Sequence, residues 1–238
     1  MPEVDLKTLH LTEPFRIAHG VSSTRQVVRV RLGAAVGEAP FVPYYAEDPA
    51  ATVAWLKGAP GCAATRAGTL ALDLCQRDLA GEPLWVSAQK RLGPGRAWAE
   101  IAACRSLGIP TDLTNFAEKV RETARQFHVL KLKLGSGDLA HDEAIVSTAR
   151  AAAPGVTMFA DVNGGWSVDE TVQMLGRLRR YDLALIEQPL HHRWGIQAWQ
   201  ELQAKSPALS VPIYADESAQ NADDVARLAG LVQGVNVK

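Results

Sequence analysis

Charged side chains recur at the ends of apolar segments in the second half of the chain. The first such segment, residues 129–135, alternates between apolar residues and two lysines, Lys131 and Lys133, before a glycine ends it. Alternation with a period of two is typical of a β-strand and places both lysines on one face. Two buried ammonium groups on one face are unfavourable unless anions or a metal-bound ligand compensate them. The sequence therefore predicts anionic groups opposite these lysines, unless the segment is a solvated edge strand.

Acidic residues end the next three apolar segments. Asp161, Glu187 and Asp216 each stand just before a loop, and a further segment ends in Lys238. A single acid after a strand is common in caps and turns, whereas three in succession between lysine-bearing segments favour a shared site. Converging carboxylates repel one another unless a cation neutralises them, and such oxygen ligands suit Mg²⁺, with Mn²⁺ as a substitute. Three independent caps or turns are the alternative.

The elements that would position these residues alternate between strands and helices. Short apolar segments recur near Ile101, Val129, Met158, Leu183, Ile213 and Val235. Helical patterns lie between them, over residues 115–127, 142–153, 167–180, 194–205 and 222–229. Repeated β-α units predict a parallel sheet, and both a (β/α)₈ barrel and an open doubly wound sheet fit. The strand ends carry neither Gly-x-Gly-x-x-Gly nor a P-loop, which disfavours a nucleotide-binding sheet.

The first part of the chain has a different character and predicts an α+β domain. Its expected elements are strands over residues 4–11 and 27–32 and helices over residues 50–57 and 65–79. The small, polar residues 18–25 predict a mobile loop, and residues 37–40 and 43–49 predict a second irregular segment. Residues 91–95 mark the boundary, so that the predicted domains are 1–95 and 96–238.

Composition excludes several classes of partner. The 238-residue chain has a formal net charge of −1 and no basic tract, so we expect no nucleic-acid partner. It has no apolar run of membrane-spanning length, and no apolar leader follows its acidic N-terminus, so we expect no membrane partner and a cytoplasmic location. The widely spaced cysteines suit a reducing compartment; they are Cys62, Cys75 and Cys104.

The order of the charged motifs resembles the enolase superfamily, in its muconate-lactonizing-enzyme subgroup. The motifs are Lys131-x-Lys133, Asp161-x-Asn163, Glu187-Gln188-Pro189, Asp216-Glu217-Ser218 and Asn236-x-Lys238. Residues 14–17, 37–39 and 71–74 of the first domain fit the same family. Within the subgroup, residues 43–47 are most similar to dipeptide epimerases of the Ala-Glu type.

The resemblance implies a fold and a reaction. The fold is a modified (β/α)₇β barrel, a variant of the TIM barrel, with an N-terminal α+β capping domain. The residues that would hold Mg²⁺ are Asp161, Glu187 and Asp216. The implied reaction, in a racemase or epimerase, is abstraction of the proton α to a carboxylate. Lys131 would stabilise the developing charge, while Lys133 and Lys238 would remove and return the proton on opposite faces.

The resemblance also implies how the substrate, a small carboxylate or a dipeptide, is held. Residues 18–25 and 43–48 would close over it. The side chains expected to contact it are His19, Arg25, Tyr45 and Asn163. His191 and His192 would lie on the loop surface or in the wall of the pocket.

The family continues beyond the point that corresponds to Lys238, through two more barrel strands and, in dipeptide epimerases, an Asp-x-Asp motif for the substrate ammonium group. We therefore expect a barrel lacking its last strands, which is either part of a longer protein or a truncated product, and a homo-oligomer. Two alternatives remain open. A cycloisomerase or an o-succinylbenzoate synthase would use the same lysines, and an inactive fragment would serve in binding or assembly.

Overall fold

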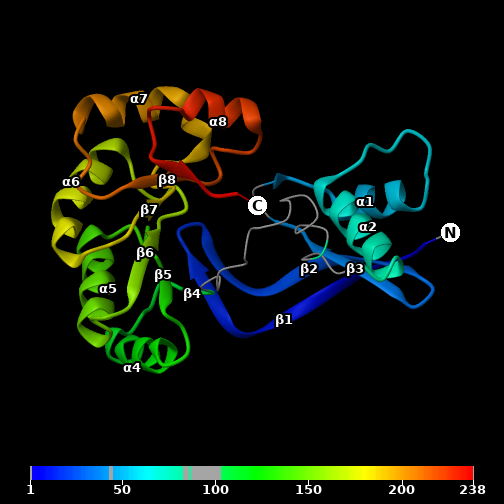
Figure 1. The fold of residues 1–238 in the computed structure, drawn as a ribbon, viewed down its shortest axis with the longest axis horizontal. Coiled ribbons are helices and arrows are strands. Elements are labelled where there is room, and N and C mark those ends of the chain that lie inside the picture. Colours follow the sequence, from blue (N-terminus) through cyan, green and yellow to red (C-terminus); the bar gives the residue numbers. More distant parts are fainter. Residues whose placement is uncertain (1, 43–44, 83–85, 87–102, 238) are drawn as a thin grey trace. The chain divides into compact units, whose positions relative to one another are not determined.

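The chain forms two compact units, each with its own hydrophobic core (Figure 1). The computed structural model describes residues 2–42, 45–82, 86 and 103–237. One unit consists of residues 1–14 and 22–99, and the other of residues 15–21 and 100–238. The boundary predicted at residues 91–95 lies outside the described residues.

The first unit is an antiparallel sheet with two helices. Its elements are β1 (Glu3–Ile17), β2 (Gly20–Leu32), β3 (Ala35–Pro40), α1 (Pro49–Leu56) and α2 (Arg66–Leu79), and the sheet order is β1-β2-β3. Helix α2 packs so closely on β3 that a Cβ on Gly37 would lie 1.9 Å from the backbone oxygen of Ala71. Glycine at position 37 therefore permits the contact between the helix and the sheet.

Two predictions for the first part of the chain are wrong. Residues 18–25 do not form a mobile loop, because β2 begins at Gly20 and only Ala18 and His19 form the turn after β1. Residues 37–40 are not irregular, because they belong to β3. Most of the residues along the hairpin of β1 and β2 are exposed, so its strands tolerate small polar side chains that elsewhere indicate a loop.

The second unit contains a six-stranded parallel sheet in the order β4-β5-β6-β7-β8-β9. The strands are β4 (Cys104–Leu107), β5 (Val129–Lys133), β6 (Thr157–Asp161), β7 (Ile186–Glu187), β8 (Ile213–Ala215) and β9 (Gly234–Val235). Spatial order follows chain order throughout, as in a barrel, whereas a doubly wound sheet reverses its order at a switch point. The barrel prediction is therefore confirmed, and the open doubly wound alternative is excluded.

The helices of this unit cover one side of the sheet (Figure 1). They are α4 (Leu113–Ala124), α5 (Leu139–Ala152), α6 (Val168–Leu178), α7 (Gly195–Lys205) and α8 (Ala222–Leu228), with short 3₁₀ turns at Arg179–Tyr181 and His192–Trp194. Every helix predicted here is present, with ends that differ by at most three residues. The capping box at the start of α6 is formed by Ser167 and Glu170.

Strand β5 is the second strand of the sheet, so the solvated edge-strand alternative is excluded. Leu130 and Leu132 are fully buried in the core, and Lys131 and Lys133 alternate with them. In the parallel register Lys133 lies opposite Asp161, which in turn lies opposite Glu187 on the next strand. The sheet itself therefore brings this lysine and these carboxylates to one row.

No helix among the described residues is long and apolar enough to cross a bilayer. Cys62, Cys75 and Cys104 are all free thiols, and Cys75 is buried between β3 and α2.

Candidate active site at the carboxyl ends of the parallel strands

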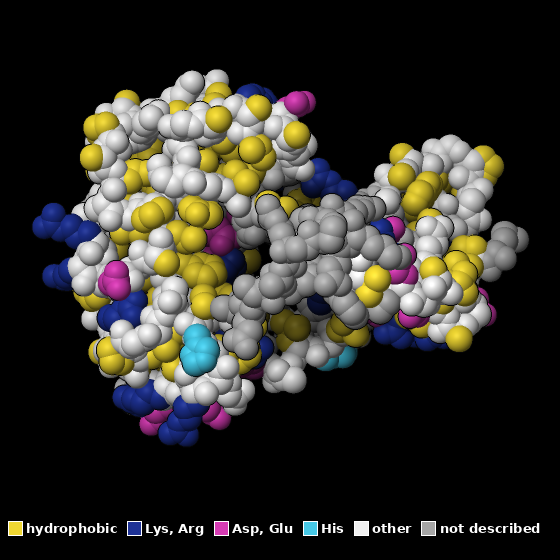
Figure 2. Space-filling model, viewed as in Figure 1, with side chains coloured by type: hydrophobic (Ala, Val, Ile, Leu, Met, Phe, Trp, Pro, Cys, Tyr) yellow, Lys and Arg dark blue, Asp and Glu magenta, His cyan; other side chains and the backbone are white. Residues whose placement is uncertain are grey.

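Two lysines and two carboxylates from three neighbouring strands form an ion-pair cluster. Lys133 Nζ donates to Asp161 Oδ2 at 2.5 Å, and Lys131 Nζ donates to Glu187 Oε2 at 2.6 Å. Lys131 Nζ also lies 3.5 Å from Asp161 Oδ2 and 5.3 Å from the centre of the Phe159 ring. Figure 2 shows acidic and basic surface side by side among the hydrophobic side chains of this unit. The sequence prediction that anions face the lysines is confirmed.

A buried glutamine, Gln188, anchors the backbone at the third acid, Asp216. The backbone N–H of Asp216 donates to Gln188 Oε1 at 2.8 Å, and the N–H of Ser218 donates to the same oxygen at 3.1 Å. Gln188 Nε2 donates to the Leu190 oxygen and to Ser218 Oγ. Gln188 thus joins the loop after β7 to the loop after β8. Sequence reasoning assigned it no role, although its place between Glu187 and a proline is the signal that singles it out.

Burial and mutual repulsion dominate the electrostatics of Glu187. Burial raises the pKa of its carboxyl group, and the neighbouring Asp161 carboxylate raises it further, while hydrogen bonds from Lys131 and Asn236 partly offset the rise. Burial lowers the pKa of Lys131, but the carboxylates of Asp161 and Glu187, with a smaller effect from Asp216, outweigh burial and raise it above its ordinary value. Lys131 is therefore held as an ammonium ion.

The donor set suits a hard divalent cation, although lysines supply the positive charge in this structure. Asp161, Glu187 and Asp216 are buried carboxylates at the ends of successive strands, and oxygen donors of this kind are those that Mg²⁺ prefers. Among the described residues, no three acidic, cysteine or histidine side chains lie close enough together to hold a metal ion. Lys131 and Lys133 instead neutralise the first two of these carboxylates.

A second hydrogen-bonded chain leads away from Lys133. Lys133 Nζ donates to Asn163 Oδ1 at 2.9 Å, and Asn163 Nδ2 donates to Glu217 Oε1 at 2.9 Å. The backbone N–H of Asn163 donates to Asp161 Oδ1. Both ends of the Asn163 amide are therefore bonded to protein groups. Glu217 belongs to one of the sequence motifs, but no role was predicted for it.

The turn between β1 and β2 packs on the rim of the barrel unit, to which residues 15–21 belong. A Cβ on either Gly135 or Gly165 would lie 2.9 Å from the Cβ of Ala18, so the two glycines make room for the turn. The ring of His19 meets the ring of His191 edge-on, with 5.5 Å between centroids. The structure thus brings one residue predicted to contact substrate to the loop that follows β7.

His191 and His192 stack on each other, with 4.6 Å between ring centroids. Burial lowers the pKa of both rings. The charges of Arg193 and His19 lower both pKa values further, and His192 also acts on His191. The rings of His191 and His192 are therefore held towards their neutral forms.

The other predicted site residues are Arg25, Tyr45 and Lys238. Arg25 and Tyr45 belong to the first unit, where Arg25 Nη1 contacts the Phe41 oxygen at 3.5 Å and Tyr45 packs under the Arg66 guanidinium. Arg25 also lines a pocket of about 470 Å³ in that unit. Lys238 lies outside the described residues.

Acids thus stand at the ends of three successive strands of the parallel sheet, and two lysines lie on the strand before them. Residues 115–238 match the family described as "Enolase C-terminal domain-like". This match covers more than half of the chain, and the chain belongs to that family.

Several characterised proteins are similar to this chain. The hydrophobic dipeptide epimerase of Roseobacter litoralis is 32% identical over 176 residues, which are 71% of this chain and 48% of the relative. The L-Ala-D/L-Glu epimerase of Bacteroides thetaiotaomicron is 31% identical over 174 residues, which are 72% of this chain and 43% of the relative. The chain thus spans somewhat less than half the length of these curated relatives.

A solved structure has the same fold. The dipeptide epimerase of Enterococcus faecalis V583, complexed with Mg and the dipeptide L-Leu-L-Tyr, superposes with a TM-score of 0.79 at 23% identity. The match covers 100% of this chain and 73% of that one. At this level of identity the comparison establishes the fold.

Proposed function

We propose that the protein is a Mg²⁺-dependent racemase or epimerase that abstracts the proton α to a carboxylate, with a dipeptide as its substrate. The observation that carries the proposal is the cluster in which Lys131 and Lys133 pair with Asp161 and Glu187 across three neighbouring strands. The similarity to curated dipeptide epimerases supports the choice of substrate class.

Asp161, Glu187 and Asp216 would hold the Mg²⁺ ion. When bound, the ion supplies positive charge that offsets the negative charge developing on the substrate carboxylate. Lys131 adds a second positive charge to the site, and its raised pKa keeps it protonated at neutral pH. Preorganised charge of this kind stabilises a charged intermediate without reorganising solvent.

Lys133 and Lys238 would act as the two bases of an inversion. Lys133 ends β5, the second strand of the sheet, and Lys238 follows β9, the sixth. In a barrel, strands four apart face each other across the mouth, which would allow one lysine on each face of the α-carbon. A lysine that removes a proton must be neutral when the substrate arrives.

The side chain of the substrate would be recognised away from the reacting carbon. We assign this role to His19, which lies beside His191 on the rim, and to Arg25 and Tyr45 of the first unit. Binding energy spent at such positions sets specificity. A homo-oligomer in the cytoplasm, without nucleic-acid or membrane partners, remains our prediction.

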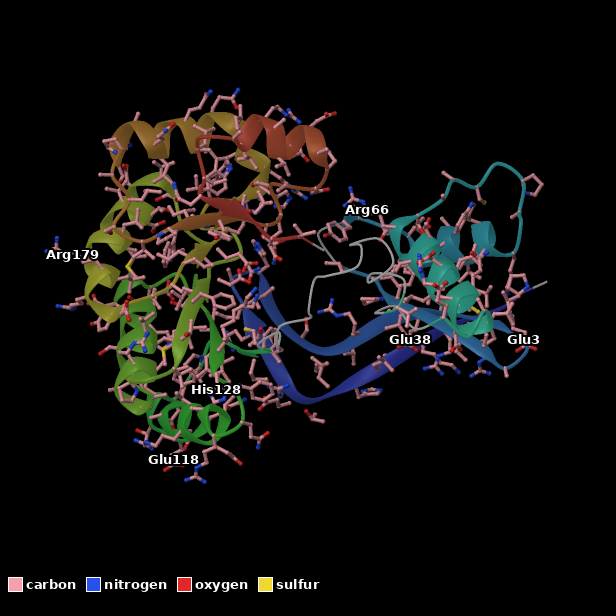
Figure 3. The ribbon with its side chains drawn as sticks, in the orientation of Figure 1. Glu3, Glu38, Arg66, Glu118, His128 and Arg179 are labelled. Carbon is pink, nitrogen blue, oxygen red and sulfur yellow. The ribbon has the colours of Figure 1, made fainter. Side chains whose placement is uncertain are left out.

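The test is α-proton exchange. The protein is incubated with Mg²⁺ and a panel of L,L-dipeptides in heavy water, and deuterium at the α-carbons is followed by NMR. We expect exchange that depends on Mg²⁺ and is lost in Asp161→Asn and Glu187→Gln. Glu118→Gln is the matched control, because Glu118 is exposed on α4 and points away from the sheet (Figure 3).

Two outcomes would overturn the proposal. Either Mg²⁺ binds but no dipeptide exchanges, or the protein converts a cycloisomerase or o-succinylbenzoate synthase substrate instead. Within an active enzyme, His19→Ala should change the ranking of dipeptides more than the rate on the best one. An unchanged ranking would place recognition elsewhere.

A further inference from the structure

The chain of hydrogen bonds from Lys133 through Asn163 to Glu217 lies beside the ion-pair cluster and is buried throughout. Lys133 is 9% exposed, Asn163 is 6% exposed and Glu217 is 5% exposed. The two bonds that join them are each 2.9 Å long. Glu217 is therefore linked to Lys133 only through the side chain of Asn163.

The Asn163 side-chain amide has a fixed orientation between Lys133 and Glu217. An amide has an acceptor end and a donor end, and its neighbours decide which way each end points. Glu217 Oε1 accepts from Asn163 Nδ2, so the amide carbonyl is turned towards Lys133 Nζ. Glu217 therefore presents an acceptor, and not a donor, to the lysine.

This orientation constrains the Lys133 nitrogen. Its N–H groups are accepted by Asp161 Oδ2 and Asn163 Oδ1. Besides its bond to carbon, a tetrahedral nitrogen has three positions for hydrogen atoms or a lone pair. The two hydrogen bonds fix the directions of two of them, and tetrahedral geometry then fixes the third. That third position is the one that carries a proton, or a lone pair, towards a substrate. The Asn163 carbonyl is thus one of the two groups that aim it.

The second oxygen of Glu217 argues against a purely stabilising role for this pair. Glu217 Oε2 is buried and, among the described side chains, is the one buried oxygen or nitrogen without a hydrogen-bond partner. A buried unpaired acceptor destabilises a protein.

We propose that Glu217 is a positioning residue that acts through Asn163 to aim the Lys133 amine, and that Asn163 orients this lysine and does not contact the substrate. This inference rests on the proposed function, in which Lys133 is one of two bases. It assigns Glu217 a role that neither its sequence motif nor its distance from the reacting atoms suggests.

The first measurement does not depend on turnover. Trace acetylation with acetic anhydride, followed by peptide mass spectrometry, reports the reactivity of Lys133 relative to the exposed Lys57 in the same sample. We expect Glu217→Leu to raise the relative labelling of Lys133 severalfold, because the amine loses an ordered acceptor. Glu217→Gln should restore the wild-type value, because its amide oxygen can still accept from Asn163. Glu118→Gln is the surface control.

The second measurement uses deuterium exchange from each epimer of an active dipeptide. We expect Glu217→Leu to slow about tenfold the α-proton exchange with retention of the epimer that reacts with Lys133, and to leave exchange with retention of the other epimer unaffected. Epimerisation itself slows equally in both directions, because both lysines act in each. A merely structural role would slow exchange with retention of both epimers together, and that result would overturn the proposal. Should Glu217→Leu fail to fold, Asn163→Asp tests the same link, because it places a second carboxylate opposite that of Glu217. Adding Glu217→Gln to this variant should relieve the repulsion between them.

The two arms separate this inference from the proposed function. If the wild-type protein exchanges no α-proton, the proposed function fails, while the labelling of Lys133 still decides whether Glu217 positions it. If Lys133 labelling is the same in the wild type, Glu217→Leu and Glu217→Gln, the positioning role is wrong whatever the activity.

Discussion

Lys131 is the residue on which the charge balance of the cluster depends. Its ammonium group bonds Glu187, lies close to Asp161 and adds a cation–π contact with Phe159. The side chain is 16% exposed, so these contacts are poorly screened by solvent. Removing one partner from a buried ion pair is more damaging than replacing the whole pair, because the remaining charge is left uncompensated.

We therefore predict that Lys131→Met lowers the free energy of unfolding by about 3 kcal/mol at neutral pH. The pKa of Lys131 is raised in the folded protein, so its contribution is complete below the ordinary lysine pKa and disappears as the pH rises through the raised value. Urea denaturation across this alkaline range should show the wild type and the variant converging. Equal stability at neutral pH would contradict the prediction, and Lys57→Met, an exposed change, is the control.

The sequence predicted most of the charged residues of the cluster, but not the contacts between their side chains. Lys131, Lys133, Asp161 and Glu187 were found from the sequence because each ends or lines an apolar segment. The contacts of Gln188 could not be predicted, because they join it to residues about thirty positions away. Polar residues of this kind have no periodic signal, and only the folded loops reveal their partners.

At the scale of elements, the buried carboxylate of Asp142 ties two loops of the barrel rim together. It lies on α5 and accepts from the backbone N–H groups of Gly135 and Ser136 and from Trp166 Nε1. Three donors satisfy it fully without a cation. The loops that it joins follow β5 and β6, the strands that carry Lys133 and Asp161.

We predict that Asp142→Asn destabilises the fold by about 2 kcal/mol, because the new amide group replaces an acceptor with a donor that faces another donor. Chemical denaturation measures the change. The matched control is Asp169→Asn, on the exposed start of α6. A loss no larger than that of the control would show that solvent, and not Asp142, satisfies these loops.

Helices were predicted better than the first hairpin, for a physical reason. Helices α4 to α8 have apolar faces that pack on the sheet, so burial imposes a pattern on their sequences. Residues 18–25 contain small polar side chains in a strand whose faces are largely exposed, and burial imposes no pattern there. Residues 15–21 belong to the barrel unit and contact Gly135 and Gly165 there. These contacts join residues far apart in the sequence, so the local sequence pattern does not predict them.

At the scale of the whole molecule, the carboxylates proposed as metal ligands all belong to one of the two units. The two units have separate hydrophobic cores, so each can lose its structure in its own transition. A ligand that binds one folded unit stabilises that unit by mass action.

We predict that calorimetric unfolding shows two transitions and that Mg²⁺ raises only the one belonging to residues 100–238. At a free Mg²⁺ concentration about 100 times Kd, binding should add about 2.7 kcal/mol to that unit. Asp161→Asn should abolish the shift. A shift of both transitions, or of neither, would contradict the assignment of the metal to these carboxylates.

The order of the sheet was predictable because repeated β-α units of similar length leave few topologies. The choice between a barrel and an open sheet was not, because both have the same local pattern. The absence of a reversal in strand order decided it, and that is a property of the assembled sheet alone.

The strand-end acids and the loop residues that follow them differ in how freely they can be substituted. Asp161 and Glu187 are the last residues of β6 and β7, so the sheet holds them, whereas His191 and His192 belong to the loop that follows. The two proposed metal ligands and the loop that lies beside His19 are thus separate, adjacent stretches of chain. We expect a library that randomises residues 191–195 alone to vary the surroundings of His19 while the proposed metal ligands stay unaltered, which makes this loop a starting point for directed evolution.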